Sequence, residues 1–219
     1  MKTIRTNAQE RILEAAVELF ASQGFRGTGT RDIARRAEVT DTSLFRHFPH
    51  KEDLFWAAVE SRLKRVEIRP ELQAGLAQGA EPAVVVPLIV ELMVQVASCH
   101  PQLVRLLNVG YLELRPRMEP IYHQYLAPLF TAIAKYLAGH SGDAANSALR
   151  NKDPYITTAA VAATILAHSG VYQLVTGNPT PYASMPEAIQ AYSAYFLDSL
   201  LPEGARYGAT AGKTTQVIG

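Results

Sequence analysis

Apolar residues recur three and four positions apart along most of this chain, and no stretch alternates between apolar and polar residues at every second position. The first spacing is typical of helices with one buried face, whereas alternation would indicate half-buried strands. The sequence therefore predicts an all-α fold. With 219 residues, of which 48% are hydrophobic, the chain is long enough to bury a substantial core in one large or two small domains.

The helices predicted near the amino terminus are short. Asn7 is suited to cap a first helix, and Gly24 is suited to end it, because glycine accepts the left-handed conformation common at helix ends. Thr28 or Thr30 can then cap a second helix over the sequence RDIARRA. Its Ile33, Ala34 and Ala37 are expected to face the core, while its arginines remain in solvent.

A three-residue turn, Glu38 to Thr40, follows that helix. Thr40 is expected to cap a third helix, which Pro49 stops, since proline cannot continue a helix. Two short helices joined in this way and packed on a preceding helix make a helix-turn-helix, whose second short helix can enter the major groove of DNA. The sequence thus predicts a DNA-binding motif.

The whole chain is expected to divide into three parts. These are an amino-terminal domain over 1–69, a larger helical domain over 70–202 and a disordered tail over 203–219. A fourth helix is predicted over 51–68, and Pro70 with the glycine-containing segment after it is interpreted as a junction. The segment 139–153 is predicted to be a loop. Further helices are predicted at 83–98, 102–113, 118–138, 155–175 and 187–201.

Charge and cysteine content give weaker guidance. Residues 1–69 hold 13 Lys and Arg against 10 Asp and Glu, a net charge of +3, and the remainder holds 8 against 10, a net charge of −2. The single cysteine, Cys99, cannot form an internal disulfide, and neither a secretory signal nor an uninterrupted apolar run of about 18 residues is visible. We expect a soluble cytoplasmic protein that does not enter a membrane.

The third helix offers a surface suited to nucleic acid. Val39, Leu44 and Phe48 are expected to point to the core, and Lys51, at the start of the next helix, can meet a phosphate. Hydroxyl, guanidinium and imidazole groups are suitable partners for base edges and phosphate oxygens. The side chains on or near the outward face are Asp41, Thr42, Ser43, Phe45, Arg46 and His47.

Over about its first 60 residues the chain resembles the TetR family of transcriptional regulators. The segment GTGTRDIARRAEVTDTSLFRHFPHKEDLF carries the signature. The resemblance implies a double-stranded DNA operator, a palindromic site bound by a homodimer, a role most often as repressor, and a second domain that binds a small-molecule effector. It implies DNA contacts from Thr28, Thr30 and Arg31, from Thr40, Asp41, Thr42 and Ser43, from Phe45, Arg46 and His47, and from Lys51 to phosphate.

Three residues depart from the family pattern. Glu38 stands where the family usually has a turn glycine, so strained geometry is expected there. Phe45 replaces a tyrosine and lacks its phosphate-binding hydroxyl. Asp41 opens the recognition helix, where the helix dipole favours an acid, and it faces negatively charged DNA. We expect this carboxylate to discriminate between DNA sites by meeting a cytosine amino group or a nearby arginine.

The second domain contains polar groups among apolar walls, which suit a small-molecule pocket. A buried tyrosine is more often a satisfied core residue, so internal packing remains the alternative for each. The candidate effector-binding residues are His100, Tyr111, Tyr122, Tyr125, His168 and Tyr172.

The last two predicted helices carry the candidate dimer interface. Small residues on one helix allow close approach of a second copy, and an apolar stripe follows on the other, although internal packing could use the same faces. The candidate residues are Ala159, Ala163, Ala167, Gly170, Ile189, Tyr192, Phe196 and Leu200.

Other functional classes are less consistent with the sequence. An all-helical enzyme would need a nucleophile with its base, and no such set, zinc-protease motif or phosphate-binding glycine loop is visible. His47 and His50 lack a third ligand nearby, so neither a metal site nor a cofactor is expected. A DNA-packaging protein would not need the large apolar second domain, whereas an activator on the same scaffold remains an alternative to a repressor.

Overall fold

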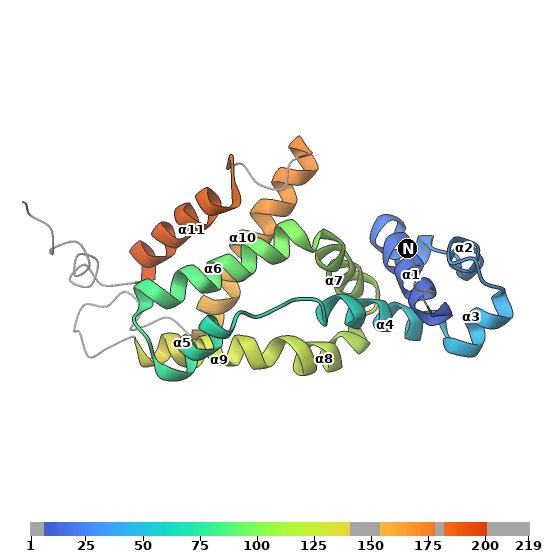
Figure 1. Cartoon of the computed structure of the whole chain (residues 1–219), viewed down its shortest axis with the longest axis horizontal. Coiled ribbons are helices and arrows are strands. Elements are labelled where there is room, and N and C mark those ends of the chain that lie inside the picture. Colours follow the sequence, from blue (N-terminus) through green and yellow to red (C-terminus); the bar gives the residue numbers. More distant parts are fainter. Residues whose placement is uncertain (1–6, 141–153, 178–181, 201–219) are drawn as a thin grey trace, which may run out of the picture. The chain divides into compact units, whose positions relative to one another are not determined.

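The computed structural model describes residues 7–140, 154–177 and 182–200, and these residues form helices without any strand (Figure 1). The predicted all-α fold is thus confirmed. The helical elements, in chain order, are α1 (Ala8–Gly27), α2 (Thr30–Arg36), α3 (Asp41–His47), α4 (Lys51–Leu63), α5 (Pro70–Gln78), α6 (Pro82–Cys99), α7 (Pro101–Glu113), the 3-10 turn η1 (Arg115–Arg117), α8 (Met118–Ile121), the π-helical turn η2 (Tyr122–Leu126), α9 (Ala127–Gly139), α10 (Pro154–Thr176) and α11 (Met185–Leu200).

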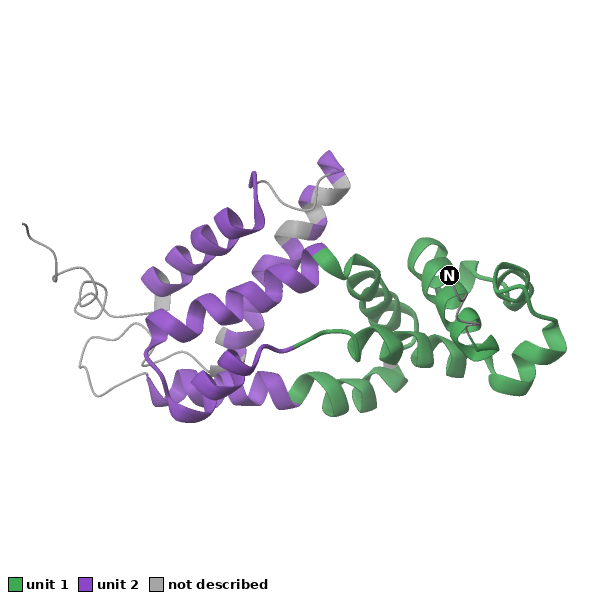
Figure 2. Ribbon diagram, viewed as in Figure 1, with its two compact units in different colours: residues 1–67, 99–127 green, residues 68–98, 128–219 purple. Residues whose placement is uncertain are grey.

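The chain divides into two compact units, shown in Figure 2. The amino-terminal unit comprises residues 1–67 and 99–127, and the carboxyl-terminal unit comprises 68–98 and 128–219. The first division lies close to the predicted domain boundary at residue 69. Residues 99–127, which the sequence placed in the second domain, instead belong to the first unit because Leu106 and Ile121 join its core.

The core of the amino-terminal unit gathers around α1. Ile12, Ala16, Val17 and Phe20 of this helix are completely buried, as their helical spacing predicts. The Phe20 ring meets the edge of the Phe55 ring at a centroid distance of 5.2 Å. Edge-to-face packing of this kind stabilises aromatic pairs beyond their buried area. This core holds the short helices α2 and α3 against α1.

The asparagine cap of α1 is confirmed in full. The Asn7 side chain accepts a hydrogen bond from the Gln9 amide, and the Glu10 carboxylate accepts one from the Asn7 amide, which completes a capping box. Gly24 breaks the helical geometry with φ 75° and ψ 174°, and a short helical continuation then runs to Gly27. The first helix therefore kinks at Gly24 instead of ending there.

The segment after Pro70, which was interpreted as a junction, forms helix α5. Proline at the first helical position needs no amide partner there, and Gly79 in the left-handed conformation ends the helix. Helix α4 in turn ends at Leu63 instead of residue 68. Four of the later helices are confirmed to within two residues, whereas the run predicted at 118–138 contains the π-helical turn η2. Residues 141–153 and the tail lie outside the described residues.

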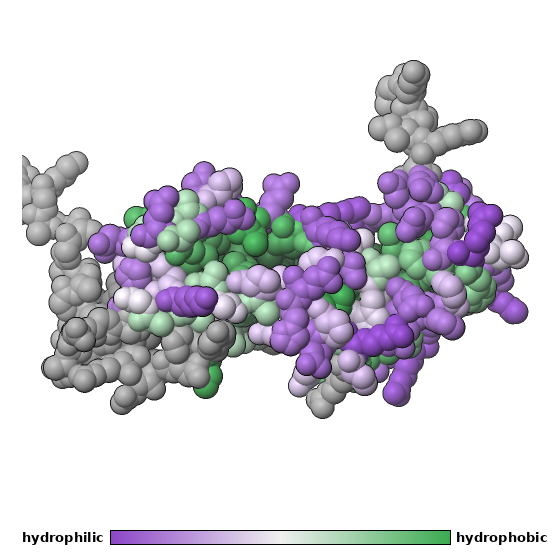
Figure 3. Space-filling view, turned by 90° about the horizontal axis from the view of Figure 1, so that it is seen from below, coloured by the Kyte–Doolittle hydropathy of each residue, from purple (hydrophilic) through white to green (hydrophobic). Residues whose placement is uncertain are grey.

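The carboxyl-terminal unit has a core built largely on α6. Val85 and Val90 of this helix are completely buried. By length and composition α6 is long and apolar enough to cross a membrane, with a mean hydropathy of 1.9, and 44% of that stretch is buried. Hydrophobic residues also gather on the face of this unit shown in Figure 3.

Candidate nucleic-acid interface

The turn between α2 and α3 is held by backbone hydrogen bonds. The Glu38 amide donates to the Arg35 carbonyl oxygen at 3.2 Å, and the Val39 amide donates to the Ala34 carbonyl oxygen at 3.0 Å. This pair of bonds is the Schellman motif, which places one residue in the left-handed region. Glu38 occupies that position with φ 55°, so the prediction of strained geometry at this residue is confirmed.

Helix α3 begins as predicted at Thr40, whose hydroxyl oxygen accepts a hydrogen bond from the Ser43 amide at 3.1 Å. Leu44 and Phe48 are buried in the core of the unit. Since α3 is anchored along this buried side, its orientation relative to α1 and α2 is fixed by packing. The opposite side is therefore presented on a rigid support.

The outward side of α3 matches the surface expected from the sequence. Asp41, Thr42, Phe45 and Arg46 are exposed, and Ser43 and His47 are partly exposed. Phe45 is a large aromatic residue with 45% of its surface in solvent, which costs free energy unless a partner covers it. An acid, a hydroxyl, an aromatic ring and a guanidinium thus lie on one short helix, with the chemistry needed to contact bases and phosphates.

Asp41 and Arg31 connect the starts of the two short helices. The Arg31 Nε atom lies 3.7 Å from the Asp41 Oδ2 atom, and the two side chains are 91% and 51% exposed. The pairing of Asp41 with a nearby arginine, one of the two arrangements expected from the sequence, is therefore present. Because both groups remain in solvent, either can leave the pair for a new partner.

The predicted roles of Thr28 are wrong. Its side chain is buried, and its hydroxyl donates to the carbonyl oxygens of Gly24 at 2.8 Å and Leu19 at 3.1 Å. The hydroxyl consequently stabilises the turn before α2 and does not reach outward to DNA. Neither Thr28 nor Thr30 caps α2, because Gly29 occupies the cap position without a side-chain hydrogen bond and Thr30 is the first helical residue.

Lys51 begins α4 and is partly exposed. Its ammonium nitrogen lies 4.5 Å from the centroid of the Phe25 ring, an arrangement that favours a cation over an aromatic face. Burial lowers the pKa of Lys51, and the Glu113 carboxylate acts in the opposite direction. The ammonium group thus lies beside the Phe25 ring near the end of α1.

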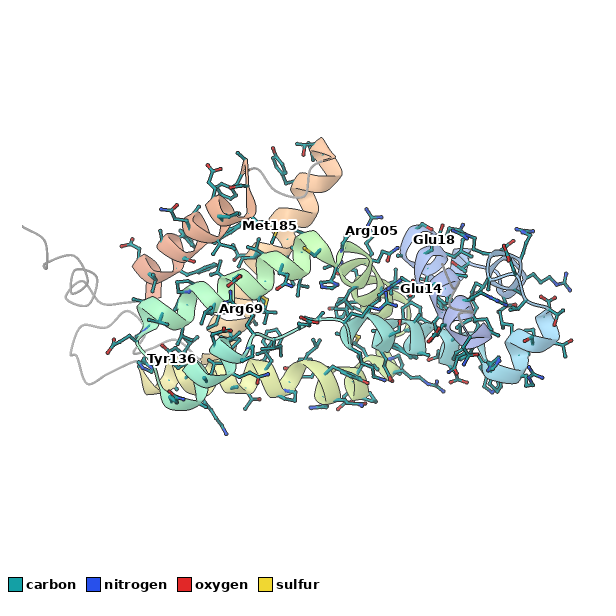
Figure 4. The ribbon with its side chains drawn as sticks, viewed as in Figure 1. Glu14, Glu18, Arg69, Arg105, Tyr136 and Met185 are labelled. Carbon is teal, nitrogen blue, oxygen red and sulfur yellow. The ribbon has the colours of Figure 1, made fainter. Side chains whose placement is uncertain are left out.

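Other arginines of the unit are engaged with acids. Arg36 lies 2.7 Å from Glu18, and Arg35 pairs with Asp32 on its own helix. Figure 4 labels Glu14 and Glu18, both on α1. Glu14 accepts hydrogen bonds from Arg62 and Arg65, which lie at 2.5 Å. These pairs agree with the interpretation of Arg35 and Arg36 as solvated residues with no part in base reading.

The six candidate effector residues are divided between the two units. His100, Tyr111, Tyr122 and Tyr125 belong to the amino-terminal unit, where Tyr125 donates to the Glu60 carboxylate at 3.1 Å. Tyr172 belongs to the other unit and is partly buried, and the side chain of His168 lies outside the described residues.

A small apolar cavity instead lies within the carboxyl-terminal unit. Its volume is about 20 Å³, roughly the space for one water molecule. This cavity could not be predicted from the sequence, because residues that line an apolar cavity follow the same periodicity as a solid core. Residues from α6, α9, α10 and α11 form its wall, among them Val86, Met93, Ile133, Val161 and Phe196.

The candidate dimer residues separate into two groups. Ala159, Ala163, Ala167 and Gly170 are exposed on α10, as a face available to a second copy would be. Tyr192 and Phe196 are buried within the carboxyl-terminal unit, so their assignment to an interface is wrong. Their apolar stripe serves the internal core. Ile189 is partly buried, and the side chain of Leu200 lies outside the described residues.

Comparison with known proteins gives matches to the amino-terminal residues. Residues 12–58 match the family described as bacterial regulatory proteins, tetR family. The HTH-type transcriptional repressor Rv3405c of Mycobacterium tuberculosis is 42% identical over 60 residues, 27% of this chain and 32% of that protein. The regulator YvkB of Bacillus subtilis is 42% identical over 45 residues, 20% and 24% of the two chains. The matched stretch thus covers about a quarter to a third of these relatives.

Similarity of fold extends much further along the chain. The crystal structure of AibR in complex with isovaleryl coenzyme A and operator DNA matches 86% of this chain and 97% of its own, with a TM-score of 0.64 and 14% sequence identity. Identity this low supports the fold alone. The sequence match spans α1 to α4, which include the capped helix α3 and the turn before it. At residues 12–58 this chain is therefore similar to the bacterial regulatory proteins of the tetR family.

Proposed function

We propose that this protein regulates transcription by binding double-stranded DNA through α3. The observation that carries the proposal is the outward face of α3, where Asp41, Thr42, Phe45 and Arg46 are exposed on a helix that is capped and anchored in the core. A short helix of this kind at the surface can enter the major groove, and its side chains can then meet base edges. Lys51 supplies a cation for a neighbouring phosphate.

In the proposed function the protein acts as a repressor and binds a palindromic operator as a homodimer. Two features support this proposal: the relative Rv3405c is a repressor, and the small residues Ala159, Ala163 and Ala167 of α10 are exposed. Two-fold symmetry of the protein would present two copies of α3 to symmetric half-sites. Such a regulator acts in the cytoplasm, where the chromosome lies.

A small, mainly apolar effector is proposed to release the protein from DNA. The apolar cavity among α6, α9, α10 and α11 supports an apolar ligand, because only Thr158 contributes a polar side chain among its lining residues. At about 20 Å³ the cavity holds no molecule much larger than water, so binding must be accompanied by movement of these helices. Differential affinity for the two arrangements would couple the effector to DNA binding.

Selection of bound fragments from genomic DNA tests the proposed function. The parent protein should enrich a few sites with dyad symmetry. Arg46→Ala should lose preference at one or two base pairs of each half-site, at a cost of about 1–3 kcal/mol. Arg35→Ala is the matched control, since Arg35 is exposed but paired with Asp32 on α2. Absence of any enriched site in the parent would refute sequence-specific regulation.

Sedimentation tests the proposed dimer. Ala163→Glu should yield monomers with weakened operator binding, because it places a charge on the exposed face of α10. Ala138→Glu adds the same charge at an exposed position of α9 and should leave the mass unchanged. If Ala163→Glu sediments like the parent dimer, this face is not the interface.

A further inference from the structure

The segment 24–29, from the kink of α1 to the residue before α2 and called the α1–α2 turn below, receives a carboxylate from a distant part of the sequence. Glu113, at the end of α7, accepts hydrogen bonds from two consecutive backbone amides, those of Phe25 at 3.3 Å and Arg26 at 3.0 Å. Each carboxylate oxygen serves one amide. Amides next to a helix break have no partner within the helix, so an acceptor supplied by another element satisfies them.

Gly24 makes room for this carboxylate. A Cβ atom built at residue 24 would lie 2.9 Å from the Glu113 Oε1 atom, closer than such atoms approach in practice. The φ of 75° at Gly24 also favours a residue without a side chain. The Gly24 carbonyl oxygen also accepts a hydrogen bond from the Thr28 hydroxyl. The turn is thus held by hydrogen bonds from both the Glu113 carboxylate and the Thr28 hydroxyl.

Positive charge gathers at the same place. The Arg26 Nε atom lies 3.9 Å from Glu113, and the ammonium of Lys51 lies over the ring of Phe25, the residue whose amide the carboxylate binds. Two converging amides with cations nearby form the type of backbone concavity that binds anions in proteins. Here the anion is a side chain of the protein itself, with only 24% of its surface in solvent.

We propose that Glu113 is a positioning residue for DNA binding, which holds the α1–α2 turn in the conformation that sets α2 and Lys51 for contact with DNA. This role rests on the proposed function. Glu113 itself need not touch DNA, because it acts through the amides of Phe25 and Arg26. Loss of its carboxylate should leave the turn to sample several conformations before DNA is bound.

The sign of the effect on DNA affinity separates positioning from simple electrostatics. Removal of an acid from a DNA-binding protein should strengthen its attraction to phosphates. Loss of positioning acts in the opposite direction, since reordering even one residue of the turn costs about fivefold in affinity. Glu119→Gln is the matched control, because Glu119 lies on α8 of the same unit, is 80% exposed and has only His123 at 3.8 Å.

Hydrogen exchange and DNA binding should therefore be measured on the full chain for the parent, Glu113→Gln, Glu113→Ala and Glu119→Gln. A glutamine offers one acceptor oxygen for two amides. We expect the amides of Phe25 and Arg26 to exchange about tenfold faster in Glu113→Ala, with Glu113→Gln between it and the parent. DNA affinity should fall about fivefold in Glu113→Ala and stay equal or rise in Glu119→Gln.

Unchanged exchange at Phe25 and Arg26 in both Glu113 variants would overturn the positioning role. Faster exchange together with DNA affinity equal to or above that of the parent would show that the ordered turn does not contribute to binding, which also overturns the proposal. If the parent itself binds no DNA, the proposed function fails and the link to DNA falls with it. The exchange data would still decide whether Glu113 orders the turn, so the two failures are distinguishable.

Discussion

Replacement of Asp41 by asparagine should change DNA binding far more than it changes folding. The Arg31–Asp41 pair spans 3.7 Å with both side chains largely in solvent, so screening keeps its contribution to stability below about 1 kcal/mol. Asparagine retains an oxygen that can accept hydrogen bonds at the start of α3, and Thr40 still provides the cap. We therefore expect the free energy of unfolding to fall by less than about 1 kcal/mol.

The effect of Asp41→Asn on DNA binding is larger than its effect on folding, because two changes add together. The negative charge that faces the phosphates disappears, and Arg31, which is 91% exposed, is released from its partner. If the released Arg31 neutralises one further phosphate, the slope of log affinity against log salt steepens by about 0.9 for each α3 bound. Between 50 and 200 mM salt, one such contact changes the ratio of affinities by about 3.5-fold.

Salt titrations with random-sequence DNA, and selection of preferred sites from a random pool, measure these effects. Asp41→Asn should bind random DNA more tightly and lose preference at one or two positions of each half-site. Asp32→Asn is the control, because it releases Arg35 on α2 while leaving the start of α3 intact. If Asp41→Asn shows the parent's selected sites and salt slope, Asp41 acts only at the helix start and the reasoning is wrong.

Three further predictions concern other contacts of the amino-terminal unit. Lys51→Ala should reduce the salt slope of DNA binding by about 0.9 for each copy of α3 bound, and an unchanged slope would rule out a phosphate contact. Gly110→Ala should lower the free energy of unfolding by about 1–3 kcal/mol, because its Cβ atom would lie 2.9 Å from the Trp56 ring. The fluorescence of this single tryptophan reports the unfolding transition, and an unchanged midpoint would contradict the close packing. Burial opposes the ionisation of Glu14, but hydrogen bonds and charge attraction from Arg62 and Arg65 outweigh burial and lower the pKa of Glu14. The contribution of the Glu14 carboxylate to stability is therefore present above pH 4.5 and is lost as the pH falls through the lowered pKa. Glu14→Gln should thus lose less stability than the parent on acidification, and identical acid denaturation curves would refute this.

The helix-turn-helix could be predicted from the sequence because its determinants are local. A cap such as Thr40, a turn of three residues and apolar positions such as Leu44 each act within a few residues of their partners. The same local signals were misread at α5. Pro70 and Gly79 were interpreted as breakers, although proline at the first helical position and glycine just after the last are start and stop signals of a helix.

Contacts between distant segments could not be predicted in the same way. The Thr28 hydroxyl can face either solvent or the preceding turn, and only the fold brings the Gly24 carbonyl oxygen within its reach. Tyr192 and Phe196 form an apolar stripe that suits an internal core and a subunit interface equally well. Periodicity identifies the buried side of a helix but does not identify the surface that covers it.

The left-handed conformation of Glu38 has a consequence for the engineering of thermal stability. A residue with a side chain at φ 55° raises the free energy of the folded protein by about 1–2 kcal/mol. Glycine would remove this strain, but its greater conformational freedom in the unfolded chain lowers the free energy of unfolding by about 0.5–1 kcal/mol. Asparagine tolerates the left-handed region without that entropic loss. Heat tolerance should therefore improve more with Glu38→Asn than with Glu38→Gly, in a turn where the backbone amides of residues 38 and 39 donate hydrogen bonds to α2.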